Sequence, residues 1–88
     1  MSEPAESDVV ATTELVARFA PNSPDPATLS RDLDLVRDLG YDSVRLVKLL
    51  LAVDEAFAVA LPIEAMLGGP GLSIAGLAAA VSRARGKP

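Results

Sequence analysis

Asp38-Leu39-Gly40-Tyr41-Asp42-Ser43-Val44 is the stretch that decides the fold, and an apolar segment that ends at Phe57 follows it directly. Asp and Ser are both favoured at helix N-caps, because their side-chain oxygens accept hydrogen bonds from unpaired N–H groups of the first turn. Gly40 comes just before them, and glycine adopts a positive φ without steric cost. The stretch therefore predicts a turn followed by a capped helix that opens at Ser43.

The helix after Ser43 carries two apolar stripes. The first recurs at helical spacing, which predicts the side that packs into the core, with Phe57 as its largest side chain. Its members are Leu46, Leu49, Leu50, Val53 and Phe57. The second stripe lies on another side of the helix and consists of Val44, Val47 and Leu51. It either packs beneath a loop or forms an exposed docking patch beside Ser43, and we favour the patch.

Hydrophobic periodicity indicates a helix on each side of this segment. The first is predicted from Asp8 to about Ala20, after a frayed lead-in of residues 1–7. The last is predicted to begin after Ser73, whose side chain is placed as its N-cap. Its buried stripe is expected to contain Ile74, Leu77 and Val81, with Leu72 and Leu77 as a hydrophobic staple.

The connections complete the plan. A proline-rich start predicts a long loop over residues 21–42, which leucines should pin to the core. These are Leu29, Leu33, Leu35 and Leu39. A short helix is expected near residues 62–67, with Pro62 at its first position and Gly68-Gly69 past its end. We therefore predict an all-α four-helix bundle, with three longer helices and one short helix, whose domain spans residues 8–85 and ends in a tail of residues 86–88.

Composition narrows the function. The chain has 88 residues, of which 50% are hydrophobic and 3% aromatic, so one small aliphatic core is expected. The absence of Cys and His excludes disulfides, thiolate nucleophiles, metal sites built on those ligands and imidazole catalysis, which argues against an enzyme. The net charge of -4 disfavours nucleic-acid binding. With no secretory signal and no apolar run long enough for a membrane, we expect a cytoplasmic protein.

The stretch from Leu39 to Val44 resembles the Leu-Gly-x-Asp-Ser-Leu signature of acyl and peptidyl carrier proteins. The resemblance continues through the following helix at Leu49, Val53, Asp54-Glu55 and Phe57. It implies that 4'-phosphopantetheine is esterified to the Ser43 hydroxyl, with Asp42 and Gly40 shaping the site. A separate phosphopantetheinyl transferase that uses coenzyme A and Mg²⁺ would attach the arm, so Ser43 is a substrate and no residue is catalytic. Capping remains a second role for the same segment.

The resemblance also implies the partners. The thiol of the arm would supply thioester chemistry that this Cys-free chain lacks, and acyltransferase, adenylation/ligase or ketosynthase enzymes would load and unload it. We expect these enzymes to contact a face made of Val44, Arg45, Val47, Lys48, Leu51 and Met66. We further expect a monomeric, free-standing carrier.

The charges near Ser43 bear on the pathway. Carriers of primary fatty-acid synthesis resemble one another in having acids shortly after the serine, whereas this chain has Arg45 and Lys48 there. The predicted short helix contains only Glu64 as an acid. Both departures favour a specialised pathway of polyketide or nonribosomal peptide type. The alternatives are primary fatty-acid synthesis and a non-catalytic helical adaptor that uses the same fold for protein contact.

Overall fold

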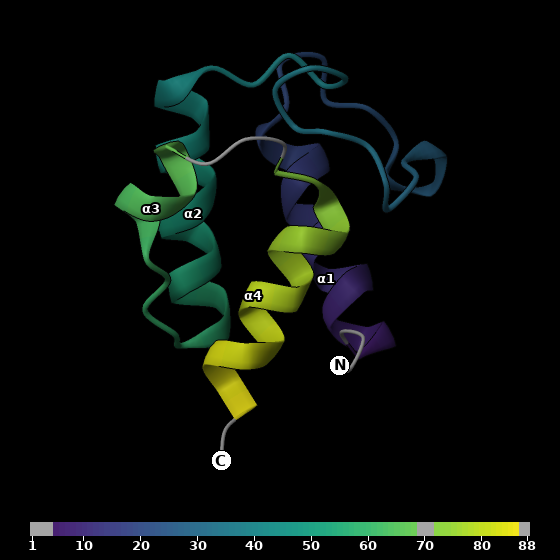
Figure 1. Cartoon of the computed structure of the whole chain (residues 1–88). Coiled ribbons are helices and arrows are strands. Elements are labelled where there is room, and N and C mark those ends of the chain that lie inside the picture. The colour runs from purple at the N-terminus through teal and green to yellow at the C-terminus, as the bar shows by residue number, and fades with distance from the viewer. Residues whose placement is uncertain (1–4, 69–71, 87–88) are drawn as a thin grey trace.

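Every regular element of the chain is helical in the computed structural model, which describes residues 5–68 and 72–86. Figure 1 shows three longer helices, α1 (Glu6–Phe19), α2 (Ser43–Phe57) and α4 (Ile74–Gly86), with the short helix α3 (Ile63–Gly68) lying against α2. A single 3-10 turn, η1 (Pro26–Thr28), interrupts the long connection. The predicted all-α bundle is therefore confirmed. No helix among the described residues is long and apolar enough to cross a membrane.

Helix α1 begins at Glu6, inside the lead-in predicted for residues 1–7. Ala5 occupies the N-cap position without a side-chain cap, and residues 1–4 lie outside the described part of the chain. Glu6 and Asp8 fall in the first turn, where acidic groups interact favourably with the helix dipole. This favourable charge placement explains why the helix extends beyond the boundary predicted from apolar spacing.

The long connection between α1 and α2 is tied to the start of α4. Leu35 is fully buried, Leu29 and Leu39 pack against the core, and Leu33 is half-buried. The Leu35 N–H donates to the Leu72 carbonyl at 2.9 Å, and the Leu33 carbonyl accepts from the Ile74 N–H at 3.2 Å. The connection thus crosses the end of the bundle where α1 ends and where α2 and α4 begin (Figure 1).

Helix α2 buries the stripe predicted for it, with one exception. Leu46, Leu49, Leu50 and Val53 are buried, whereas Phe57 at the end of the helix is only half-buried. Phe57, predicted as the largest side chain of this stripe, does pack against the core, but it is less buried than the other four. Helix α2 ends at Phe57, beside the edge of the core, and the Arg85 guanidinium covers the ring at 5.6 Å from its centroid.

Helix α4 follows its prediction closely. Ser73 is the N-cap, because its Oγ accepts from the Gly76 N–H at 2.9 Å, and Leu72 packs against the core as the staple requires. The expected stripe of Ile74, Leu77 and Val81 is fully buried. Helix α3 begins at Ile63, so Pro62 lies just before its first residue, and Gly68 is its last residue; Gly69 lies outside the described residues.

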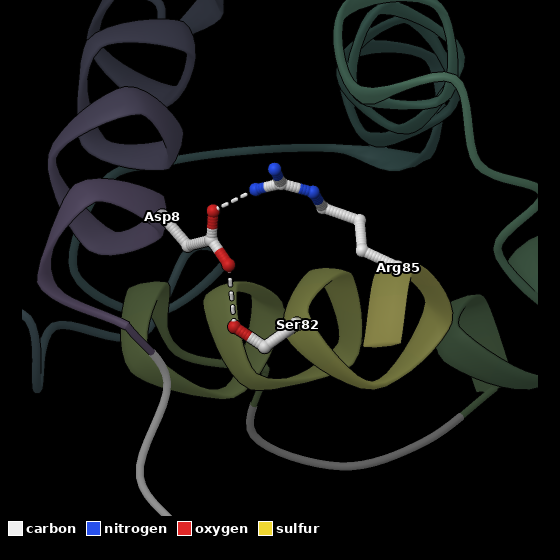
Figure 2. Close-up of polar contacts among 3 residues, drawn as sticks. All are labelled: Asp8, Ser82 and Arg85. Carbon is white, nitrogen blue, oxygen red and sulfur yellow. Dashed lines mark hydrogen bonds and ion pairs between the residues drawn. The ribbon is translucent and has the colours of Figure 1, made fainter. Parts of the chain in front are cut away.

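A polar contact joins the two ends of the chain. Figure 2 shows the buried Asp8 carboxylate of α1 between Ser82 and Arg85 of α4. The Ser82 hydroxyl donates to Asp8 at 2.6 Å, and the Arg85 guanidinium forms an ion pair with the other carboxylate oxygen. Since a buried carboxylate is tolerated only when it is paired and hydrogen-bonded, this contact fixes the start of α1 against the last turns of α4.

Candidate functional site

Gly40 sets the backbone path into α2. Its φ of +81° lies in the left-handed region, which confirms the predicted role of this glycine. A Cβ at this position would meet the Pro21 side chain at an ordinary contact distance of 3.5 Å, so the requirement for glycine comes from the backbone angle and not from crowding. Any other L-residue at Gly40 would strain the turn that precedes Ser43.

Asp42 caps α2. Its Oδ1 accepts from the Arg45 N–H at 2.8 Å, and its carbonyl accepts from the Leu46 N–H at 2.9 Å. The capping interpretation is thus confirmed for Asp42. Ser43 is the first helical residue and takes no part in the cap, which leaves its hydroxyl available for chemistry.

The Ser43 side chain is exposed at the first position of α2. No hydrogen bond among the described residues engages its hydroxyl. The sequence contains no His that could act as a general base for it. An exposed, unengaged hydroxyl of this kind suits an acceptor that another enzyme modifies better than a nucleophile that acts by itself.

Two side chains near Ser43 are bonded to the end of α1. The Tyr41 hydroxyl donates to the Val16 carbonyl at 2.5 Å, and the Arg45 guanidinium donates to the Phe19 carbonyl at 3.1 Å. Both carbonyls belong to the last turn of α1, and the Val16 carbonyl also accepts from the Ala20 N–H at 3.0 Å. Both sides of Ser43 are therefore held in a fixed position relative to α1.

Sequence reasoning missed the role of Tyr41, which is 2% exposed and belongs to the core. The available signal was compositional: Tyr41 is the single tyrosine of a chain with 3% aromatic residues, and it stands directly beside the glycine of the turn. A large amphipathic ring at such a position is more readily explained by burial with a hydrogen-bonded hydroxyl than by a variable loop residue.

Burial raises the pKa of Tyr41 well above its ordinary value, and the Arg45 guanidinium offsets part of that rise. Because the folded state holds this proton more tightly, the contribution to stability is complete below about pH 10 and is lost as the pH rises further. We expect Tyr41→Phe, which has no such proton, to lose less stability than the wild type between about pH 9 and about pH 11. Urea unfolding at each pH measures this, and parallel pH profiles for the two proteins would contradict the assignment.

The second stripe of α2 is mostly exposed. Val44 is 63% and Leu51 54% exposed, while Val47 is half-buried, so the alternative that this stripe packs beneath the loop is wrong for the first two. Lys48 is exposed between them. Val44 and Leu51 therefore form an exposed apolar surface on α2 close to Ser43. Adjoining exposed apolar side chains of this kind can mark a site of protein contact.

Met66 does not share a hollow with these residues. It is half-buried on α3 and lines a separate hollow of about 410 Å³ between α3 and α4, together with Leu61 and Leu72. Of the residues predicted for one partner face, five lie along α2 from Val44 to Leu51, and Met66 lies on α3, which packs against α2.

A family model described as "Phosphopantetheine attachment site" matches residues 11–81, a span that runs from α1 into α4 and includes the whole α2 site. The chain belongs to this family. It is a carrier protein whose covalent cofactor is 4'-phosphopantetheine, and the carrier domain itself is non-catalytic and interacts with partner enzymes. No curated protein and no solved structure matches the chain significantly.

The carrier's α2 terminus fits a phosphodiester. The helix has 15 residues and begins at Ser43, and the first-turn N–H groups that have no partner within the helix lie at this end. These groups and the helix dipole stabilise an anion at this end. When bound, the arm supplies a thiol, which the Cys-free carrier lacks.

Proposed function

We propose that Ser43 is the attachment residue of the arm, and that the chain carries acyl or aminoacyl intermediates in a pathway of polyketide or nonribosomal peptide type. The observation that carries the proposal is the exposed, unengaged Ser43 hydroxyl at the start of a helix that Asp42 already caps. A phosphopantetheinyl transferase, using coenzyme A and Mg²⁺, would form the phosphodiester at Ser43 Oγ. Thioesters on the arm would then be presented to acyltransferase, adenylation/ligase or ketosynthase enzymes at high effective concentration.

The charges on α2 support the choice of pathway. Arg45 and Lys48 follow Ser43 where carriers of fatty-acid synthesis are expected to have acids, and no acidic residue occurs in the first turn of α2. An enzyme that binds acidic carriers through a basic surface would meet the like charges of Arg45 and Lys48 here. This repulsion lowers the affinity and slows association. The docking surfaces of this carrier's partner enzymes are therefore expected to be less basic than those of fatty-acid enzymes.

The exposed stripe supports α2 as the docking side. Val44 and Leu51 expose apolar area close to Ser43, and a partner that covered them would bring its own active site within reach of the arm. The carrier must also dissociate from each partner enzyme. A small contact area such as this patch gives weak, transient binding, which allows that dissociation.

The intact mass of the protein recovered from its native host distinguishes the candidate functions. We expect one phosphopantetheine plus an acyl or aminoacyl group that hydroxylamine releases, because thioesters are cleaved by this reagent. A saturated fatty acyl group would favour primary fatty-acid synthesis. A protein without any arm would favour the helical adaptor and contradict the proposal.

A further inference from the structure

A surface hollow of about 510 Å³ lies where α1 ends and α2 begins. It is lined by Arg18, Phe19, Asp42, Val44, Arg45 and Lys48. Asp42 and Val44 are the two sequence neighbours of Ser43, so the hollow adjoins the proposed attachment residue. The α1 residues Arg18 and Phe19 were not part of the face predicted from the sequence.

The hollow is basic in a protein that is acidic as a whole. Arg18, Arg45 and Lys48 are exposed around it, whereas the chain has a net charge of -4. Asp42 is the one carboxylate in the lining, and its Oδ1 is occupied by the helix cap. None of the three cations forms an ion pair with a carboxylate of the described residues. The lining therefore carries three cations and one carboxylate, so it remains positively charged.

Arg45 is also held in place. Its guanidinium donates to the Phe19 carbonyl at 3.1 Å, which joins the two helices that form the hollow. A cation that is positioned before binding loses less side-chain entropy when an anion reaches it. Phe19, which packs against the core, and the exposed Val44 contribute apolar surface to the lining.

We propose that this hollow is the docking site for an acidic segment of a partner enzyme, which contacts α1 and α2 together. The inference rests on the proposed carrier function, because the partner must approach Ser43 to act on the arm. Mixed apolar and cationic lining suits a protein segment with carboxylate and apolar side chains. Three cations on a chain of this charge are too few for the counterion release that drives nucleic-acid binding.

The test uses an oligoglutamate peptide as the acidic probe and amide NMR shifts of the full chain as the readout. At low salt we expect shifts confined to the residues that line the hollow. The variant Arg18→Gln with Lys48→Gln should bind the probe about three- to tenfold more weakly, because two rim charges are removed. Arg45 is left unchanged, since its side chain also joins the helices. Raising the salt concentration should remove the difference.

The matched control is Arg37→Gln with Arg83→Gln, which changes the net charge equally through exposed arginines elsewhere. It should bind as the wild type does. Equal affinities for all three proteins, or shifts centred on α4, would overturn the proposal. Inorganic phosphate that produced the same shifts with the same affinity would also overturn it, because the hollow would then be a simple anion site.

The carrier function and the docking site can be tested independently of each other. Each protein is first treated with coenzyme A, Mg²⁺ and a broad-specificity transferase, and its mass is measured at completion. A gain of one phosphopantetheine supports the carrier function whatever the titration shows. No gain by the wild type contradicts the carrier function even if the acidic probe binds.

Discussion

Ser43→Ala is expected to gain no phosphopantetheine when it is incubated with coenzyme A, Mg²⁺ and a broad-specificity transferase, whereas the wild type gains one. The reason is chemical: alanine has no oxygen at which the phosphodiester could form. Intact-mass measurement gives an all-or-none readout. Ser30→Ala is the matched control, because Ser30 is an exposed loop serine that no Leu-Gly-x-Asp sequence precedes, and it should gain the arm normally. A mass gain by Ser43→Ala would show that the arm is attached elsewhere.

The same variant should fold normally, so that loss of the arm is not a folding defect. Because Asp42, not Ser43, caps α2, we expect Ser43→Ala to change the free energy of unfolding by no more than about 0.5 kcal/mol, as for other exposed positions. Removing the cap itself with Asp42→Ala should cost about 1 kcal/mol. If Ser43→Ala were the more destabilising of the two, the capping assignment would be incorrect.

Leu49→Ala is expected to have the largest effect on stability, with a loss of about 2–5 kcal/mol, because Leu49 is fully buried on α2 and its truncation leaves a cavity. Such a loss is a large part of the roughly 5–15 kcal/mol that holds a domain together. Phe57→Ala should cost less, at about 2 kcal/mol, because Phe57 keeps part of its area exposed and removes less apolar surface from water.

Urea unfolding at neutral pH compares the two variants through their midpoints, provided that the slopes are equal. The ranking is the informative result, since both variants shorten an apolar side chain of α2. A greater loss for Phe57→Ala would mean that the ring is more central to the core than its partial burial indicates.

The structure suggests how a small domain can present a long arm reproducibly. Tyr41 and Arg45 connect both sides of Ser43 to carbonyls of α1, and the Gly40 turn and the Asp42 cap fix the backbone between them. Two tertiary contacts and two local features therefore hold the backbone around Ser43, the proposed attachment point. Motion would be confined to the arm, whose reach then sets the effective concentration of the cargo at each partner enzyme.

The sequence by itself determined the local features of this protein. The apolar spacing of α2 and α4, the cap at Asp42, the cap at Ser73 and the positive φ at Gly40 all follow from interactions within a few residues of each position. Helix periodicity and capping act over one turn, so their signals are written in adjacent residues. Membership of the phosphopantetheine attachment family could be predicted for the same reason, because the residues that resemble the family signature are adjacent in the sequence.

Only the tertiary structure decided which side chains meet across the bundle. Tyr41 bonds to a carbonyl 25 residues away, and Arg45 to one 26 residues away. Asp8 reaches Ser82 and Arg85 across 74 and 77 residues. Such contacts depend on how the helices pack, which no local pattern encodes, and packing also left Phe57 at the edge of the core and brought Arg18 beside Lys48.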